Sequence, residues 1–93
     1  MKHKIVSVYD SAAAVYNKPF PVGTTALAVR GFVDALMAPD SDLAKHPTDY
    51  SLFIVAEFDD NTGTFTSVEP PECLAKAHEL LAEIRNQEHN TNA

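Results

Sequence analysis

The run of residues 50–68 constrains the fold of this chain more than any other segment. Residues 50–58 are apolar at the centre of both alternating faces, a pattern typical of a central strand that is covered on both sides. Residues 59–63, Asp-Asp-Asn-Thr-Gly, form a hairpin loop in which Gly63 is free to adopt a positive φ. Residues 64–68 then return as a second strand. The sequence therefore predicts an antiparallel hairpin at the middle of a sheet.

The N-terminal part of the chain predicts one more strand followed by a loop. Residues 4–9 are rich in β-branched and aromatic side chains, which favour a strand. Pro19 and Pro21 each bias the preceding residue toward an extended conformation. We therefore expect residues 12–23 to end in an extended loop.

Two amphipathic helices follow from the spacing of apolar residues. Thr24 or Thr25 supplies an N-cap hydroxyl for a helix over about residues 25–37. Its apolar stripe is expected to comprise Ala26, Val29, Val33, Leu36 and Met37. Pro70 and Pro71 predict the start of the second helix, because a proline is tolerated at the first helical position. The stripe of that helix is expected to comprise Leu74, Ala77, Leu80, Leu81 and Ile84.

The element order β-α-β-β-α predicts an α+β fold, in which a small antiparallel sheet of three or four strands has two helices packed on one face. The polar segment 39–49 is expected to be a surface loop. We assign residues 1–85 to a single α+β domain and residues 86–93 to a disordered C-terminal tail. A sheet this small leaves edge strands unpaired, so a homodimer through a sheet edge is one expected partner arrangement.

The basic N-terminus does not continue into a signal peptide or a membrane span. The apolar run 5–9 is interrupted by Ser7 and stopped by Asp10. A signal peptide needs about 7–15 apolar residues and a membrane helix about 20. We therefore expect no membrane partner and a protein that stays in the compartment where it is made.

Catalytic, metal and cofactor sites are not predicted. Cys73 is the only cysteine, which excludes an internal disulfide and a cysteine-rich zinc site. It is expected in the first turn of the last helix, five residues before His78 and therefore on a different face from it. The loop 59–63 does not follow the EF-hand pattern, because Gly63 is its fifth residue and not its sixth. The glycines are scattered, without a phosphate-binding loop. We expect a protein that is not an enzyme and binds no cofactor.

The charge is divided unevenly along the chain. Residues 1–30 hold four cations and one carboxylate, a net charge of +3, whereas residues 31–93 hold three cations and twelve carboxylates, a net charge of −9. Nucleic-acid binders are usually basic overall, because phosphate contacts supply much of the affinity. Any nucleic-acid surface is therefore expected in the N-terminal third.

In that third, cations alternate with aromatic residues. Proteins that bind single strands use cations for the backbone and aromatic rings on which bases stack. The candidate nucleic-acid-binding residues are Lys2, Lys4, Tyr9, Tyr16, Lys18, Phe20 and Arg30. The alternative for Tyr9 and Phe20 is that both are core residues.

The sequence resembles a known family in several blocks whose order and spacing are specific. They are residues 1–13, Met-Lys-His-Lys-Ile-Val-Ser-Val-Tyr-Asp-Ser-Ala-Ala; Tyr16–Phe20; Ala28–Asp34; His46–Phe53; and Glu57–Gly63. Together they resemble the small nonstructural protein of gokushovirus-type microviruses, which are single-stranded DNA phages. The resemblance covers roughly residues 1–68.

The resemblance implies a phage protein in the host cell cytoplasm that acts during viral DNA replication. Proteins of this family are described as DNA-binding or as replication accessories that act when the phage switches from duplex to single-strand synthesis. Direct binding of single-stranded DNA is the first expectation. The alternative is an interaction module that docks on the phage replication initiator or on host replication proteins. A third possibility is that the protein is a structural or packaging component of the phage. The family supplies no catalytic residues.

Overall fold

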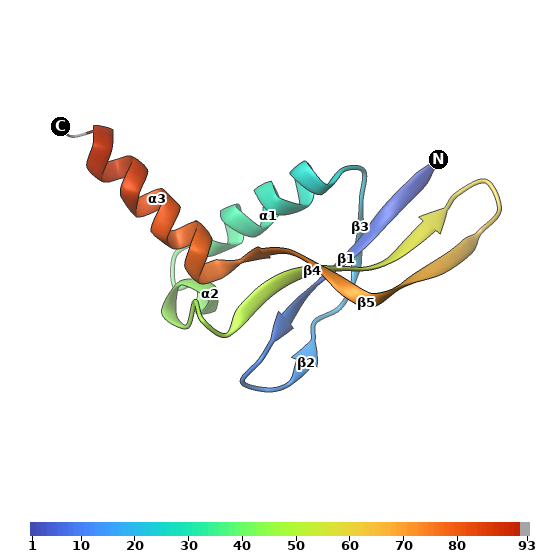
Figure 1. The fold of residues 1–93 in the computed structure, drawn as a ribbon, viewed down its shortest axis with the longest axis horizontal. Coiled ribbons are helices and arrows are strands. Elements are labelled where there is room, and N and C mark those ends of the chain that lie inside the picture. The colour runs from blue at the N-terminus through green and yellow to red at the C-terminus, as the bar shows by residue number, and fades with distance from the viewer. Residues whose placement is uncertain (92–93) are drawn as a thin grey trace.

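The structure is a computed structural model that describes residues 1–91 and the side chains of residues 1–87. Its elements follow one another in the order β1-β2-β3-α1-α2-β4-β5-α3 (Figure 1). The strands are β1 (Lys2–Asp10), β2 (Val15–Tyr16), β3 (Phe20–Val22), β4 (Tyr50–Asp59) and β5 (Thr64–Lys76). The helices are α1 (Thr25–Met37), α2 (Asp42–Lys45) and α3 (Ala77–Thr91).

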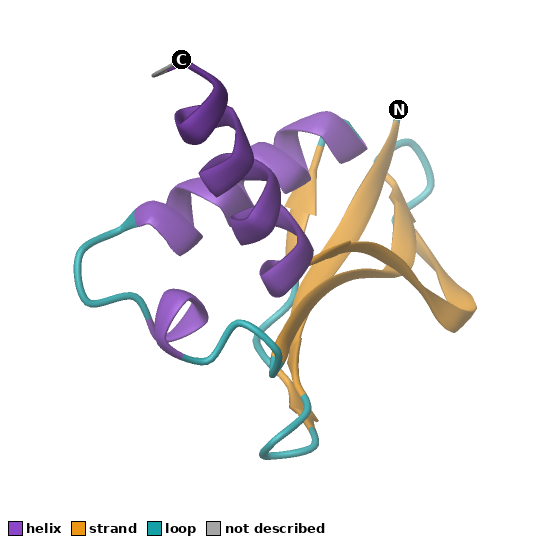
Figure 2. Ribbon diagram, turned by 60° about the vertical axis from the view of Figure 1, so that its left-hand side comes forward, coloured by secondary structure: helices purple, strands orange, loops and turns teal. Residues whose placement is uncertain are grey.

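The strands form one curled antiparallel sheet with the order β2-β1-β4-β5, and β3 also pairs with β1. The helices gather on one side of this sheet (Figure 2). The α+β class, the small antiparallel sheet and the position of the helices on one face confirm the prediction. Strand β4 lies between β1 and β5, as its two apolar faces indicated.

Alternation along β1 and β4 defines two faces of the sheet. Val6 lies opposite Ile54 and faces the helices, where both side chains are buried. Ser7 lies opposite Phe53, and these residues point the other way because successive side chains in a strand alternate. We call the first side the helix-covered face and the second the open face. No helix among residues 1–91 lies over the second side of β4 (Figure 2), and Phe53 on that side is half-buried, so the expected cover on both sides is only partial.

The core lies between the helix-covered face and α1, with one contribution from the start of α3. Its buried residues are Val6, Ala28, Phe32, Leu36, Leu52, Ile54 and Ala77. Thr24 caps α1 as expected, since its Oγ1 accepts a hydrogen bond from the Leu27 N–H at 3.2 Å. The predicted stripe of α1 is rotated, because Phe32 and Ala28 face the sheet while Met37 is exposed. Several sides of α1 are apolar, and burial of the large Phe32 ring selects the orientation.

The hairpin between β4 and β5 confirms the predicted loop. Gly63 has a φ of 72°, and its N–H donates to the Asp59 carbonyl at 2.8 Å. The Asp59 side chain accepts from the Asn61 N–H at 2.9 Å. The Asp59 carboxylate therefore stabilises the turn by accepting a backbone hydrogen bond, and Gly63 supplies the positive φ that the turn requires.

The predicted helix start at Pro70 and Pro71 is wrong. Strand β5 continues to Lys76, and α3 begins at Ala77. Residues 68–71 lie outside the β4 register as a bulge, where a proline loses no ladder hydrogen bond. Cys73 therefore lies in a strand opposite Phe53, not in the first turn of a helix.

Two segments predicted as loops contain short regular elements. Residues 20–22 form β3 along the outer side of β1, since the extended conformation that the prolines impose suits an edge strand. Residues 42–45 form α2, a single turn capped by Ser41, whose Oγ accepts from the Ala44 N–H at 3.4 Å.

The C-terminal part of the chain carries the longest helix. Helix α3 continues through Thr91, across most of the segment 86–93 for which a disordered tail was predicted. Residues 92–93 lie outside the described residues. Within residues 1–91, no helix is long and apolar enough to cross a membrane.

Candidate nucleic-acid interface

Three aromatic side chains meet on the open face, at the end of the sheet where β1 and β2 form a hairpin. The rings of Tyr9 and Tyr16 have centroids 4.6 Å apart. Phe53 packs edge-on against both, at 6.2 Å from Tyr9 and 5.8 Å from Tyr16. We call Tyr9, Tyr16 and Phe53 the aromatic cluster. The exposed fraction of Tyr16 is 44%, so part of this cluster is accessible to a ligand.

Strand pairing holds the aromatic cluster in place. Tyr9 and Tyr16 are direct cross-strand partners, which brings their side chains together on one face. Just beyond Tyr16, Asn17 is fixed to β1 through its N–H, which donates to the Val8 carbonyl at 2.8 Å. The Asn17 carbonyl accepts a 2.7 Å hydrogen bond from the hydroxyl of the buried Ser7. The position of Tyr16 therefore depends on the backbone of β1 and not on a flexible loop.

One lysine shares the open face with this cluster, and a second is close to it in the sequence. Lys76 is the direct partner of Ser51, which is itself the partner of Tyr9, so Lys76 shares the open face with the tyrosines. Lys18 is exposed and follows Tyr16 by two residues. The open face thus combines the aromatic rings with the positive charge of Lys76, and Lys18 supplies a second cation close to Tyr16 in the sequence.

Lys2 and Lys4 lie on the opposite side of the sheet from the aromatic cluster. By alternation along β1 they share the helix-covered face with Val6. The Lys4 Nζ lies 3.8 Å from a carboxylate oxygen of Glu57. Lys2 lines a shallow groove of about 230 Å³ together with Glu57, Asp59 and threonines of the β4–β5 hairpin. Carboxylates therefore offset both positive charges.

Phe20 and Arg30 are also separate from the aromatic cluster. Phe20 is the partner of Val6 and lies on the helix-covered face, with an exposed fraction of 43%. Arg30 is exposed on α1. It lies between the buried residues Ala28 and Phe32 in the sequence and so points away from the sheet. Of the seven residues predicted from sequence, the structure brings together Tyr9 and Tyr16, and Lys18 follows Tyr16 by two residues.

Sequence reasoning missed Phe53 and Lys76. Phe53 was interpreted as one of the covered residues of a central strand, and Lys76 belongs to the acidic part of the chain. Both reach the tyrosines through the pairing of β4 with β1 and β5. The sequence did contain a signal for Phe53, since the strand 50–58 carries apolar residues on both faces. With only two helices expected on one face of the sheet, an aromatic residue on the other face stays accessible.

Negative charge gathers at one end of β4. Burial raises the pKa of the Tyr50 phenol, and the nearby carboxylates of Asp10, Asp42 and Asp49 raise it further. Asp10 directly follows Tyr9 in β1, so these carboxylates lie at the same end of the sheet as the aromatic cluster, and Asp10 points to the opposite face. They repel a phosphate backbone that extends past this end, which limits a strand on the open face to local contact with the rings.

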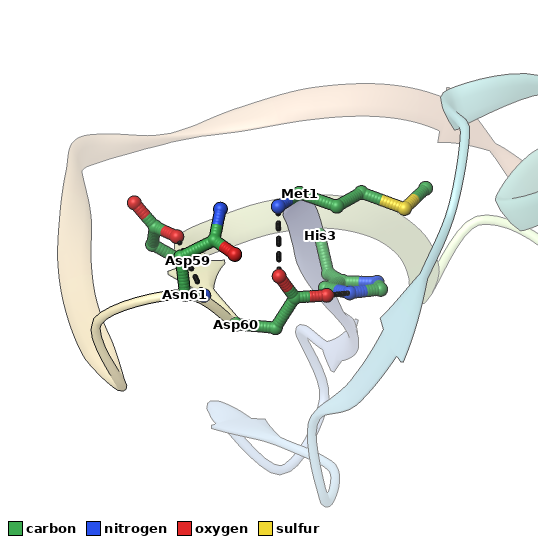
Figure 3. A network of polar contacts seen from close by, with 5 residues as sticks. All are labelled: Met1, His3, Asp59, Asp60 and Asn61. Carbon is green, nitrogen blue, oxygen red and sulfur yellow. Dashed lines mark hydrogen bonds and ion pairs between the residues drawn. The ribbon is translucent and has the colours of Figure 1, made fainter.

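At the opposite end of the sheet, Met1, His3 and Asp60 form a group of polar contacts that we call the clasp (Figure 3). The Met1 amino group donates to the Asp60 Oδ1 at 2.7 Å, and the His3 Nε2 lies 2.8 Å from the Asp60 Oδ2. The Asp60 N–H also donates to the Met1 carbonyl at 3.1 Å. The start of β1 is thereby tied to the tip of the β4–β5 hairpin.

The clasp predicts a pH dependence of stability. Hydrogen bonds from the Met1 amino group and from His3 lower the pKa of Asp60 below its ordinary value of 3.8. Its contribution is therefore present above pH 3.8 and is lost as the pH falls through the lower pKa of the folded state. We expect Asp60→Asn to unfold at a lower temperature than the wild type near pH 6, with the difference closing toward pH 2.

Thermal unfolding by circular dichroism across this pH range measures the effect, and Asp40→Asn is the control because Asp40 is exposed outside the clasp. An Asp60→Asn difference that stayed constant with pH would contradict a role for the ionised carboxylate.

The residues described by the structure contain no cluster of three or more histidine, cysteine or acidic side chains that could hold a metal ion. Cys73 is exposed, with its Sγ 3.8 Å from the Ala75 carbonyl oxygen. The geometry that stands out is therefore the aromatic cluster on the open face of a small, curled α+β sheet.

Residues 3–80 match the model of the Phage ORF5 protein family. Because this match spans most of the chain, the protein belongs to the Phage ORF5 protein family. No curated protein and no solved structure was found to match the chain.

Proposed function

We propose that this phage protein binds single-stranded DNA on the open face of its sheet. The observation that carries the proposal is the aromatic cluster, in which three rings lie together on a face without a helix. Every base has a face that can stack on an aromatic ring, and each such stack is worth about 1–3 kcal/mol. Such a surface favours single strands, because the bases of a duplex are already stacked on one another.

The charges around the cluster support a weak and salt-sensitive interaction. Lys76 shares the open face, and Lys18 is exposed two residues after Tyr16, so two cations are available for the phosphates of a strand that crosses the rings. The net charge of −6 opposes dense coating of DNA. These charges favour local contact with a single strand. The resemblance to the small nonstructural proteins of gokushovirus-type microviruses supports placing this contact in viral DNA replication, at the switch from duplex to single-strand synthesis, and we propose that it involves no catalysis.

The salt dependence of binding tests this arrangement. The logarithm of the affinity for single strands falls with the logarithm of salt concentration at about −0.7 per phosphate contacted, so two contacts predict a slope near −1.4. Replacing Lys18 and Lys76 together by glutamine is expected to weaken binding and bring the slope toward zero. Fluorescence anisotropy of a labelled 12-residue oligothymidylate measures both quantities.

The matched control is the double replacement of Lys2 and Lys4 by glutamine, which removes the same charge from the other side of the sheet. This variant should keep the wild-type slope. If it flattened the slope while the Lys18 and Lys76 variant did not, the strand would lie on the helix-covered side and the proposed surface would be wrong.

A second candidate function is docking on another replication protein, either the phage initiator or a host factor. The carboxylates of Asp10, Asp42 and Asp49 around Tyr50 favour it, since they form an acidic surface suited to a basic partner. Replacing these three residues by asparagine would abolish such docking and would strengthen binding to DNA. The two functions therefore predict opposite effects of one variant.

A further inference from the structure

Strand β5 lies at the edge of the sheet, and its two parts differ in how well they are protected against pairing with another chain. Its inner part, from Glu72 to Lys76, carries charge at both ends, and the bulge 68–71 before it contains two prolines. Both features discourage pairing with another chain. The outer part, Thr64–Ser67, carries neither charge nor proline, and its residues are exposed. We call Thr64–Ser67 the outer edge.

The other edge of the sheet is protected along its length. It consists of β2 and β3, which are two and three residues long, and of the start of β1, Lys2 and His3, with which neither pairs. Lys18, Pro19 and Pro21 lie in or between the two short strands. Short strands, lysine and proline are the devices by which sheet edges avoid association. Within residues 1–91, the outer edge of β5 is therefore the edge segment best suited to accept a further strand.

We propose that the outer edge pairs with the same segment of a second copy of this chain, in an antiparallel arrangement with two-fold symmetry. A second copy fits because an uncharged segment places no like charges opposite one another when it meets itself. Threonine and phenylalanine also favour the strand conformation on both sides of such a contact.

Symmetry selects the register. In a two-fold antiparallel pair, one residue must lie opposite its own mate. Centring the pair on Thr66 places Phe65 opposite Ser67 and Thr64 opposite Val68 of the other copy. The ladder then stays within β5, reaches only the first residue of the bulge and ends before Pro70 and Pro71. Centring it on Phe65 would draw the turn residue Gly63 into the ladder, where its positive φ of 72° does not suit a strand. Thr66 is therefore the residue that faces its mate.

In this register Phe65 lies opposite Ser67 of the other copy, so the two Phe65 side chains are diagonal neighbours, a separation that aromatic side chains can span. Phe65 is the most exposed large apolar side chain among those identified, at 66%, and it packs on Phe58 with ring centroids 4.8 Å apart. Both rings lie on the open face, since Phe58 is the partner of His3 on β1. In an antiparallel edge pair, directly opposite residues share a face, so the open faces of the two copies lie on the same side.

The interface is small, so the dimer is expected to be weak. Five residues of strand pairing and one pair of rings fall below the roughly 1,200 Å² that stable complexes bury, and a dissociation constant on the order of 100 μM is expected. Sedimentation of the wild type between 10 μM and 1 mM should show the weight-average mass rising toward twice the monomer mass. A monomer throughout this range would overturn the proposal.

Thr66→Lys provides the specific test. It places two positive charges opposite one another across the symmetry axis and should weaken dimerisation about tenfold or more. In the monomer, the introduced lysine would lie beside Glu57, the cross-strand partner of Thr66, so the variant is expected to fold. Thr48→Lys is the matched control, because it adds the same charge at an exposed loop position before the start of β4, at the other end of the β4–β5 hairpin from the outer edge. Equal dimerisation of these two variants would also overturn the proposal.

A cross-linking measurement tests the register independently. In a Cys73→Ser background, Thr66→Cys should form a disulfide-linked dimer under mild oxidation, because facing residues in an antiparallel pair lie within reach of a disulfide. Thr48→Cys should remain mostly monomeric. Cross-linking at position 48 but not at position 66 would contradict the proposed register. None of these measurements requires DNA, so their outcome is separate from that of the proposed function.

Discussion

Replacing Leu52 by alanine is expected to lower the free energy of unfolding by about 2–5 kcal/mol. The side chain of Leu52 is fully buried on β4, opposite Val8 and within the core formed with α1. Alanine would remove apolar atoms and leave a cavity that the sheet and helix fill only partly. A domain of this size has a total stability of about 5–15 kcal/mol, so a large share would be lost. Urea unfolding monitored by circular dichroism measures the difference.

Leu27→Ala is the matched control, since the same atoms are removed from a side chain on α1 with an exposed fraction of 55%. The change should stay within about 0.5 kcal/mol of the wild type. Comparable losses for both variants would contradict the assignment of the core to the space between α1 and the helix-covered face.

Replacing Tyr16 by alanine is expected to weaken binding to single-stranded DNA about 5- to 150-fold, which corresponds to the loss of one stack worth about 1–3 kcal/mol. The Tyr16 ring is accessible to a base at an exposed fraction of 44%, and the rings of Tyr9 and Phe53 pack against it. Equilibrium anisotropy with a labelled oligothymidylate at low salt measures the loss.

Phe20→Ala is a close control for this effect. Phe20 is exposed to 43% and Tyr16 to 44%, and both belong to short strands paired with β1, but they lie on opposite faces of the sheet. We expect Phe20→Ala to leave the affinity within about twofold of the wild type. Equal losses from the two variants would show that binding does not select the open face.

Much of the fold could be predicted because its signals are local. The strand 50–59 alternates along its own length, the turn at Gly63 depends on five consecutive residues, and the cap of α1 depends on Thr24 and Leu27. Each of these interactions joins residues that are close in sequence. Pattern and propensity therefore identified them without knowledge of the packing.

The prolines mark where local signals were ambiguous. Pro70 and Pro71 suit the first turn of a helix as well as a bulge in an edge strand, because neither position requires an N–H. Their position in β5 is decided by the pairing of Glu72 and Cys73 with β4. That pairing joins strands across the sheet, and local sequence does not report it.

The candidate site divides in the same way. Tyr9 and Tyr16 are near in sequence and meet through a hairpin, so both could be predicted from the N-terminal third alone. Phe53 and Lys76 join them only through the register of three strands. Lys2 and Lys4 share the basic segment with Tyr9 but face away from it, because charge composition does not determine on which face of a strand a residue lies.

Backbone NMR of the isotopically labelled protein, titrated with a short oligothymidylate at low salt, tests the central claim most directly. DNA on the open face predicts shifts concentrated at Tyr9, Tyr16, Phe53, Lys18 and Lys76, with little change at Phe20 and Arg30. The absence of shifts at millimolar DNA, or shifts confined to α1 and the helix-covered face, would contradict DNA binding at the aromatic cluster.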